Sequence, residues 1–179
     1  MFSPRIIKRI LSEYALPVNG MHGAGHWARV LENGTRLAAL TGAEIEVVQL
    51  FAVFHDSRRV NEGWDDGHGR RGAEFAAKLR GEFFQLSDES FDLLYTACAL
   101  HTDGLTEADV TIQTCWDADR LDLGRVGTRP EPLYLCTPAA KAKEMIRWAD
   151  GRGSMVFIPE IVDSAWDLGR EFGMRRAGR

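Results

Sequence analysis

The sequence predicts an all-α fold, a single-domain bundle of helices over residues 1–179. Apolar residues recur at helical spacing along nearly the whole chain, and no segment alternates apolar and polar residues as a half-buried strand does. A chain of 20.0 kDa with 45% apolar residues also has the size and composition of one compact domain. No internal repeat or low-complexity tract divides it.

Two helices are predicted before the most apolar part of the chain. The first covers residues 3–16, where basic and apolar positions alternate at helical spacing, and it ends at Pro17. The second follows a glycine-rich turn and runs to about Thr41, with His26 and Leu37 on its apolar stripe. A histidine therefore stands where the pattern expects an apolar residue.

The third predicted helix is the most apolar segment. Thr41 and Glu44 have the spacing of a capping box, in which a hydroxyl and a carboxylate each bind a free backbone N–H of the next helix. The helix over residues 45–56 is then apolar almost all round. A continuous apolar run also fits a parallel strand, but its length and the capping box favour a buried central helix.

A loop and three helices follow. Residues 58–67 are polar and contain glycine, which indicates a loop, and a helix is expected over residues 68–80 with a histidine at the start of its apolar stripe. Ser87 is expected to cap the next helix, whose apolar face ends at His101. Thr106 is expected to cap the helix after that one.

The C-terminal part is predicted to contain the longest loop and two helices. Residues 124–137 include two glycines and two prolines, which favour a loop. Helices are expected at about 138–149 and 159–172, with Pro159 at the first position of the second one.

Composition excludes several classes of protein. The net charge is -4, with 22 Lys and Arg against 26 Asp and Glu, so no electrostatic footprint for a nucleic acid polymer is expected. No apolar run is long enough for a membrane span or a secretion signal. Cys98, Cys115 and Cys136 form no Cys-x-x-Cys pair and indicate a reducing compartment. We therefore expect a cytoplasmic protein that does not act on membranes, and a homodimer is one assembly open to it.

Six polar residues interrupt the apolar faces of five predicted helices. Burying an unpaired imidazole or carboxylate costs several kcal/mol or shifts its pKa. A divalent cation shared among such groups neutralises the carboxylates and accepts the imidazole lone pairs, which offsets the cost of burial. In chain order the six residues are His26, His55, Asp56, His68, His101 and Asp119.

Their order and flanking residues match a known pattern. His26 is followed after two residues by Arg-Val, His55-Asp56 ends an apolar helix, and Asp119 lies in an Ala-Asp-x-Leu run. The ordering H…HD…H…H…D, with these flanks, resembles the HD superfamily of metal-dependent phosphohydrolases, whose fold is an all-α bundle. The resemblance covers roughly residues 20–125, and the helices at 138–172 are expected to pack on this core.

The resemblance implies a role for each of these residues. The metal ligands would be His26, His55, Asp56 and Asp119, a mixture of imidazole and carboxylate that suits Mn²⁺, Fe²⁺, Co²⁺, Ni²⁺, Zn²⁺ or Mg²⁺. His68 and His101 would either complete a site for a second metal ion or contact a substrate phosphate. The residues expected to act in catalysis are Asp56, His68, His101 and Arg59, the last as a clamp on the phosphate.

Neighbouring residues are interpreted by their place on the helices. Asp117 and Asp119 point about 200° apart on a helix, and Asp119 shares a stripe with Trp116, so Asp119 is preferred as the ligand. Asp122, one turn further on, is expected to orient a ligand histidine. His22 is expected in a loop at the mouth of the site, and Arg29 is expected to brace the bundle.

Two departures from the family pattern argue against one of the activities found in the family. The gap from His55 to His68 is shorter than the one usual in the two-metal branches, and no Gly-Tyr-Pro follows His101. Cyclic-dinucleotide phosphodiesterase activity of the HD-GYP kind is therefore disfavoured.

The sequence thus predicts an enzyme that hydrolyses a phosphomonoester or phosphodiester bond of a small phosphorylated metabolite, foremost a nucleotide, with one or two divalent metal ions. The resemblance implies that the metal would lower the pKa of a bound water and polarise the phosphoryl oxygen. Two alternatives remain. One is a di-iron oxygenase of the HD type acting on a phosphonate or polyol, and the other is a metal-bound nucleotide sensor without catalytic activity.

Overall fold

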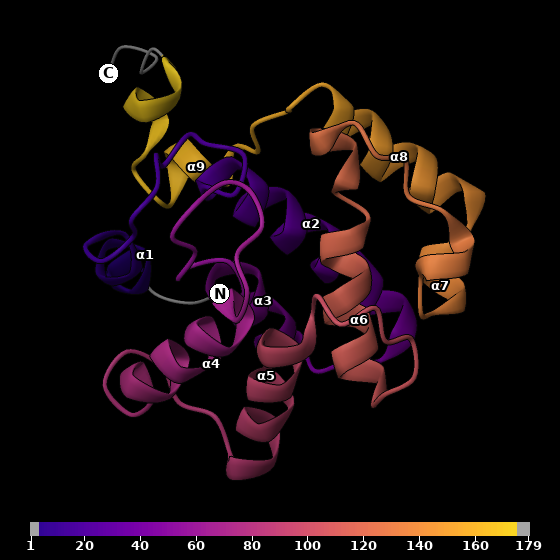
Figure 1. The fold of residues 1–179 in the computed structure, drawn as a ribbon, viewed down its shortest axis with the longest axis horizontal. Coiled ribbons are helices and arrows are strands. Elements are labelled where there is room, and N and C mark those ends of the chain that lie inside the picture. Colours follow the sequence, from indigo (N-terminus) through magenta and orange to yellow (C-terminus); the bar gives the residue numbers. More distant parts are fainter. Residues whose placement is uncertain (1–3, 175–179) are drawn as a thin grey trace.

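The computed structural model describes residues 4–174, and Figure 1 shows how they fold. Apart from one isolated bridge between Arg80 and Phe84, the regular structure of this part of the chain is helical, which confirms the all-α fold class. The α-helices are α1 (Pro4–Leu11), α2 (Ala24–Thr41), α3 (Ile45–Phe54), α4 (His68–Leu79), α5 (Asp88–Leu100), α6 (Val110–Arg120), α7 (Pro138–Lys141), α8 (Lys143–Ser154) and α9 (Ile161–Ser164). The short 3-10 helices are η1 (Leu123–Val126), η2 (Pro132–Tyr134) and η3 (Gly169–Phe172).

The core is built around α3. Residues 47, 48 and 50–54 of this helix are all buried, and it packs against α2, α5 and α6 (Figure 1). Because neighbours cover it on several sides, the helix needs no polar face. The expectation of a buried central helix in this segment is confirmed.

Glycines let other helices approach α3 closely. A Cβ atom on Gly34 of α2 would lie 2.5 Å from Val48 Cγ1, and one on Gly72 of α4 would lie 2.3 Å from Phe54 O. Any larger residue would push these helices apart, because real Cβ contacts are not this short. The second approach brings the start of α4 to the end of α3, where His55 follows.

The C-terminal helices pack on the preceding part of the chain. Helix α7 contacts α2 and α6, and α8 contacts α2 and η1. A second apolar cluster joins Leu37 and Leu121 to Met145 and Ile146 of α8. The organisation of residues 1–179 as one domain stays a prediction. No helix in residues 4–174 is long and apolar enough to cross a lipid bilayer.

One of the predicted single-residue caps is confirmed and the other is wrong. Ser87 Oγ accepts a hydrogen bond from Ser90 N at 3.1 Å, so it caps α5 as expected. The cap of α6 is Asp109, which accepts from Thr111 N at 2.7 Å, and not Thr106. The helix therefore begins three residues later than Thr106 requires, since an aspartate nearer to it offers an equally good cap.

The predicted capping box is also wrong. Helix α2 extends to Thr41, whose Oγ1 donates back to Leu37 O at 3.1 Å and lies 3.0 Å from Thr114 Oγ1. Gly42 then ends the helix in the left-handed conformation, with a φ of 77°. Glu44 is the first residue before α3, but its side chain makes no capping hydrogen bond.

Helix lengths differ from the expected ones at both ends of the chain. The first helix ends at Leu11 and not at residue 16. At its end, Ser12 Oγ donates a hydrogen bond to Arg9 O, which competes with further helical hydrogen bonding. The segment 138–149 is two helices, because Ala142 between α7 and α8 has an extended ψ of 132°.

The segment 159–172 is not one helix. It divides into α9 and η3, and between them Asp167 takes a left-handed φ of 59°. Pro159 precedes α9 by two residues and does not occupy its first position. The loop expected over 124–137 contains the short helix η2 and the end of η1.

Candidate metal centre

The structure brings all six predicted ligand residues to one place. They come from five segments that are distant in sequence, namely α2, the end of α3, the start of α4, the end of α5 and α6. Five of them are buried, and the side chain of Asp119 is 16% exposed. The six residues are His26, His55, Asp56, His68, His101 and Asp119.

A close contact between α4 and α5 places two of the histidines together. A Cβ atom on Gly69 would lie 2.3 Å from Cys98 O and 2.8 Å from His101 Nδ1. Only glycine allows this approach without a shift of the backbone. As a result, His68 Nε2 lies 3.0 Å from His101 Nε2.

We call His26, His55, Asp56 and Asp119 the first donor group. His26 Nε2 lies 3.0 Å from His55 Nε2, 3.6 Å from Asp56 Oδ2 and 3.3 Å from Asp119 Oδ1. His55 Nε2 lies 3.8 Å from Asp119 Oδ1. The donor atoms of His26, His55 and Asp56 all lie within 4.8 Å of one another, close enough for one cation to contact them, and Asp119 Oδ1 lies beside the two histidines of this set.

We call Asp56, His68 and His101 the second donor group. Asp56 Oδ1 lies 3.1 Å from His68 Nε2 and 3.7 Å from His101 Nε2. Asp56 therefore belongs to both groups, with Oδ2 turned to the first and Oδ1 to the second.

Hydrogen bonds fix the orientation of all four imidazole rings. Each Nδ1 lies close to an oxygen that can only accept, so Nδ1 carries the proton and Nε2 offers its lone pair to the centre. These contacts are His26 with Asp122 Oδ2 at 2.7 Å, His55 with Phe51 O at 3.1 Å, His68 with Asp65 O at 2.7 Å and His101 with Cys98 O at 2.8 Å.

The first donor group consequently gathers acceptors that lack donors. Among residues 4–174, no N–H or O–H of another residue is within hydrogen-bonding distance of His26 Nε2, His55 Nε2 or Asp119 Oδ1. Acceptor atoms packed at 3.0–3.8 Å repel each other unless a cation lies among them. This arrangement fits a divalent metal ion.

The charge states also fit a metal ion. Burial lowers the pKa of His55 to about 3, so its imidazole is neutral and free to coordinate at neutral pH. Burial by itself would raise the pKa of Asp56, but His55, His101 and His68 hold it well below its usual range. The pKa of Asp119 is lowered in the same way, against its burial, by His26 and His55. The centre therefore contains two ionised carboxylates.

A buried ion pair supports the ring of His26. Arg29 Nε donates to Asp122 Oδ1 at 2.7 Å and Nη2 donates to Asp122 Oδ2 at 3.0 Å, while Nη1 donates to Phe157 O. Asp122 thus holds both His26 and Arg29. These contacts agree with the expected roles of Asp122 as an orienting carboxylate and of Arg29 as a brace.

Asp117 faces away from the centre. Its carboxylate accepts hydrogen bonds from Cys136 N at 2.6 Å, Thr137 N at 2.8 Å and Thr137 Oγ1 at 2.7 Å. It therefore anchors the segment before α7. Of the two aspartates on α6, Asp119 is the one that reaches the histidines.

The two arginines after the His-Asp pair point in different directions. Arg59 Nη1 lies 3.0 Å from His68 Nε2 and 3.4 Å from Asp56 Oδ1. Arg58 Nη1 donates to Glu13 O at 2.6 Å, and its guanidinium lies 4.9 Å from the centre of the Phe75 ring. Arg59 is therefore at the second donor group, and Arg58 is not.

The structure adds residues that the sequence did not indicate. Arg125 Nη1 lies 4.0 Å from Asp119 Oδ1, and Arg125 Nε donates to Met21 O at 3.2 Å. His22, expected in a loop at the mouth, lies 2.6 Å through Nδ1 from Glu62 Oε2. Arg125 and Glu62 have no sequence signal, since Arg125 lies in the short helix η1 and Glu62 in a loop, where no periodic pattern relates them to the ligands.

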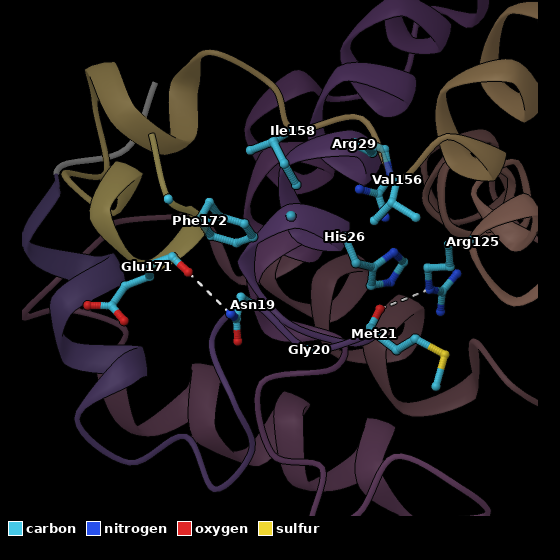
Figure 2. Close-up of a pocket in the computed structure, with 12 residues that line it drawn as sticks. Asn19, Gly20, Met21, His26, Arg29, Arg125, Val156, Ile158, Glu171 and Phe172 are labelled. Atoms are coloured by element: carbon cyan, nitrogen blue, oxygen red, sulfur yellow. Dashed lines mark hydrogen bonds between the residues drawn. The ribbon is translucent and has the colours of Figure 1, made fainter. Parts of the chain in front are cut away.

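Two cavities adjoin the centre. Figure 2 shows the one of about 480 Å³ beside His26, with Arg125 at one side and the apolar side chains of Met21, Ile158 and Phe172 along its wall. The other, of about 310 Å³, lies beside the second donor group. Its lining includes Arg59, His68 and the exposed Trp64.

Comparison with known proteins gives a match by structure. No model of a protein family matches the sequence, and no curated protein does. The fold is similar to the crystal structure of a predicted HD superfamily hydrolase from an uncultured Thermotogales bacterium. The two chains are 25% identical, the match covers 86% of this chain and 84% of that chain, and the TM-score is 0.59.

Proposed function

Since the chain belongs to the HD superfamily, we propose that it is a metal-dependent hydrolase that cleaves a phosphoester bond of a small phosphorylated metabolite, a nucleotide in the first instance. The observation that carries this proposal is the convergence of imidazole lone pairs and ionised carboxylates at the first donor group. The structurally similar protein from the Thermotogales bacterium is a predicted hydrolase, which supports the reaction class.

In this proposal, His26, His55, Asp56 and Asp119 hold the metal ion. A bound divalent metal supplies a hydroxide nucleophile near neutral pH and polarises a phosphoryl oxygen. Asp56 would help to hold the ion and, where only one ion is bound, would take the proton from the attacking water. Asp122 keeps the ring of His26 in the orientation that ligation needs.

Arginines on both sides of the centre supply positive charge for a phosphate group. Arg59 stands at the second donor group and Arg125 at the wall of the 480 Å³ cavity. A guanidinium stays charged at any working pH and can donate a charge-assisted hydrogen bond to a phosphate oxygen. The cavity beside Arg125 has the size of a small-molecule site, and its apolar wall suits the organic part of the substrate.

Protonation of the leaving oxygen is assigned to the second donor group. The Nε2 atoms of His68 and His101 face the same carboxylate oxygen, Asp56 Oδ1. A histidine whose Nε2 is not bound to metal can hand a proton to the departing alkoxide. His101 is the better placed of the two, since His68 Nε2 already accepts from Arg59.

The proposal is tested by phosphate release. The purified protein is loaded in turn with Mn²⁺, Co²⁺ or Mg²⁺ and incubated with nucleotides and sugar phosphates. We expect metal-dependent release of phosphate, which Asp56→Asn abolishes together with metal binding. Asp92→Asn, an exposed aspartate on α5, is the matched control and should leave both unchanged.

Two results would contradict the proposal. Consumption of O₂ by the iron-loaded protein, without phosphate release from any phosphoester, would mark a di-iron oxygenase acting on a phosphonate or polyol. Tight metal binding with stabilisation by nucleotides, but no turnover, would mark a sensor.

A further inference from the structure

The guanidinium of Arg59 lies within the second donor group. Its Nη1 is 3.0 Å from His68 Nε2 and 3.4 Å from Asp56 Oδ1, two of the three atoms that a metal ion there would use. Both are acceptors, since Nδ1 of His68 carries that ring's proton. Arg59 therefore donates to the acceptors that a second ion would bind.

The two donor groups differ in this respect. In the described part of the chain, no side-chain cation is recorded within hydrogen-bonding distance of His26 Nε2, His55 Nε2, Asp56 Oδ2 or Asp119 Oδ1, the atoms that face the first group. Arg125 Nη1 lies 4.0 Å from Asp119 Oδ1. At the second group, Arg59 already offers two of the acceptors an N–H partner and the carboxylate a positive charge. Only the first group needs an external cation to offset its burial.

Arg59 is held in this position by its own loop. Nη2 donates to Gly63 O at 2.6 Å, and the residue is only 8% exposed. Asp65 stabilises the loop, because its carboxylate accepts from Val60 N and from Arg71 Nη2. The short gap between His55 and His68 thus forms a compact loop that directs Arg59 inward.

We propose that Arg59 takes the place of a second metal ion, so that the chain binds one divalent ion although it has all the residues for two. The inference rests on metal binding by the first donor group, as in the proposed function. A guanidinium cannot lose its proton in a protein, and it would repel a divalent cation bound to the same Asp56 Oδ1 and His68 Nε2. The second ion can bind only when Arg59 moves out.

The test counts metal ions and measures their affinity. The full chain is purified without metal, titrated with Mn²⁺ by calorimetry, and then analysed for manganese after desalting. We expect one ion per chain for the unsubstituted protein. For Arg59→Ala we expect two, with the affinity at the second site raised at least about tenfold, and a spin-coupled pair in the electron paramagnetic resonance spectrum.

Arg58→Ala is the matched control, since this neighbouring arginine points to Glu13, and it should keep one ion. A second variant covers the case in which Arg59→Ala does not fold. His68→Ala should still bind one ion with unchanged affinity, because His68 is not a ligand while Arg59 is in place.

Two ions of similar affinity in the unsubstituted protein, or one ion in a folded Arg59→Ala, would overturn the inference and leave the proposed function standing. A loss of the single ion in His68→Ala would also overturn it. An unsubstituted protein that binds no Mn²⁺ would overturn both the inference and the metal centre on which it rests.

Discussion

Asp122 Oδ2 lies 2.7 Å from His26 Nδ1, and this contact decides which nitrogen of the histidine faces the metal centre. Asp122 also pairs with the buried guanidinium of Arg29 through both carboxylate oxygens. The carboxylate is itself buried, and it stays ionised because its contacts with His26 and Arg29 lower its pKa against the effect of burial. One residue therefore couples the orientation of a ligand to the stability of the bundle.

We predict that Asp122→Asn weakens metal binding about 10- to 100-fold. The variant removes the negative charge that fixes the His26 ring and leaves Arg29 buried without its partner, which should also lower the free energy of unfolding by about 3–5 kcal/mol. Calorimetric titration with Mn²⁺ and urea unfolding in chelator measure the two effects separately. A variant with unchanged affinity would contradict the orienting role.

Two isosteric substitutions on α6 should separate a ligand from a structural carboxylate. Asp119→Asn should reduce metal affinity by more than about 100-fold, since it removes an ionised donor from the first group. Asp117→Asn should leave metal binding unchanged and cost about 1–3 kcal/mol in stability, because its amide NH₂ would face the N–H donor of either Cys136 or Thr137. If Asp117→Asn loses the metal and Asp119→Asn keeps it, Asp117 is the ligand and Asp119 is not.

The contact between α4 and α5 offers a test by backbone packing. In Gly69→Ala the new Cβ would lie 2.3 Å from Cys98 O, so α4 must move away from α5. We predict a loss of about 1–3 kcal/mol in the free energy of unfolding, measured by urea denaturation. Gly151→Ala is the matched control on α8, where nothing lies within 4 Å of the added atom, and it should gain about 0.5–1 kcal/mol. Equal changes in the free energy of unfolding of the two variants would show that the close contact between α4 and α5 does not require glycine at position 69.

Helical periodicity is enough to predict that three of the histidines face the core, whereas the ligand set as a whole is predicted from its resemblance to the HD superfamily. His26, His68 and His101 occupy apolar positions of three helices, and residues on such faces must point to a shared core. The same reasoning favours Asp119 over Asp117. The spacing of side chains on a helix is local, so one sequence reveals it.

The parts that the sequence did not predict depend on tertiary contacts. The break at Ala142 and the left-handed Asp167 have no local signal, since neither is a glycine or a proline. Arg125 reaches Asp119 only because η1 turns the chain back after α6. The orientation of Arg59 depends in the same way on the carbonyl of Gly63.

Stability should depend on pH through His22. Burial lowers the pKa of His22 below its usual range, although Asp56 and Glu62 act in the opposite direction. Between this lowered pKa and the unfolded value of about 6.5, the unfolded chain binds more protons than the folded one, so stability falls as the pH drops. We expect the free energy of unfolding of His22→Gln to fall less between pH 7 and pH 5 than that of the unsubstituted protein. Urea unfolding in the presence of a chelator measures both. If the free energies of unfolding of the two proteins change equally with pH, His22 does not contribute to the pH dependence of stability.

Arg125 should act on substrate binding and not on the metal. Its Nε donates to Met21 O and its Nη1 to Asp122 O, whereas among the described contacts Nη2 has no acceptor (Figure 2). We predict that Arg125→Gln lowers kcat/KM about 10- to 100-fold, mainly through a higher KM, because it removes one charge-assisted hydrogen bond to the phosphate. Metal affinity should change less than about twofold. Arg129→Gln, an exposed arginine in the following loop, is the matched control and should keep its kcat/KM. If Arg125→Gln instead weakens metal binding, Arg125 acts by positioning Asp119 and not by binding substrate.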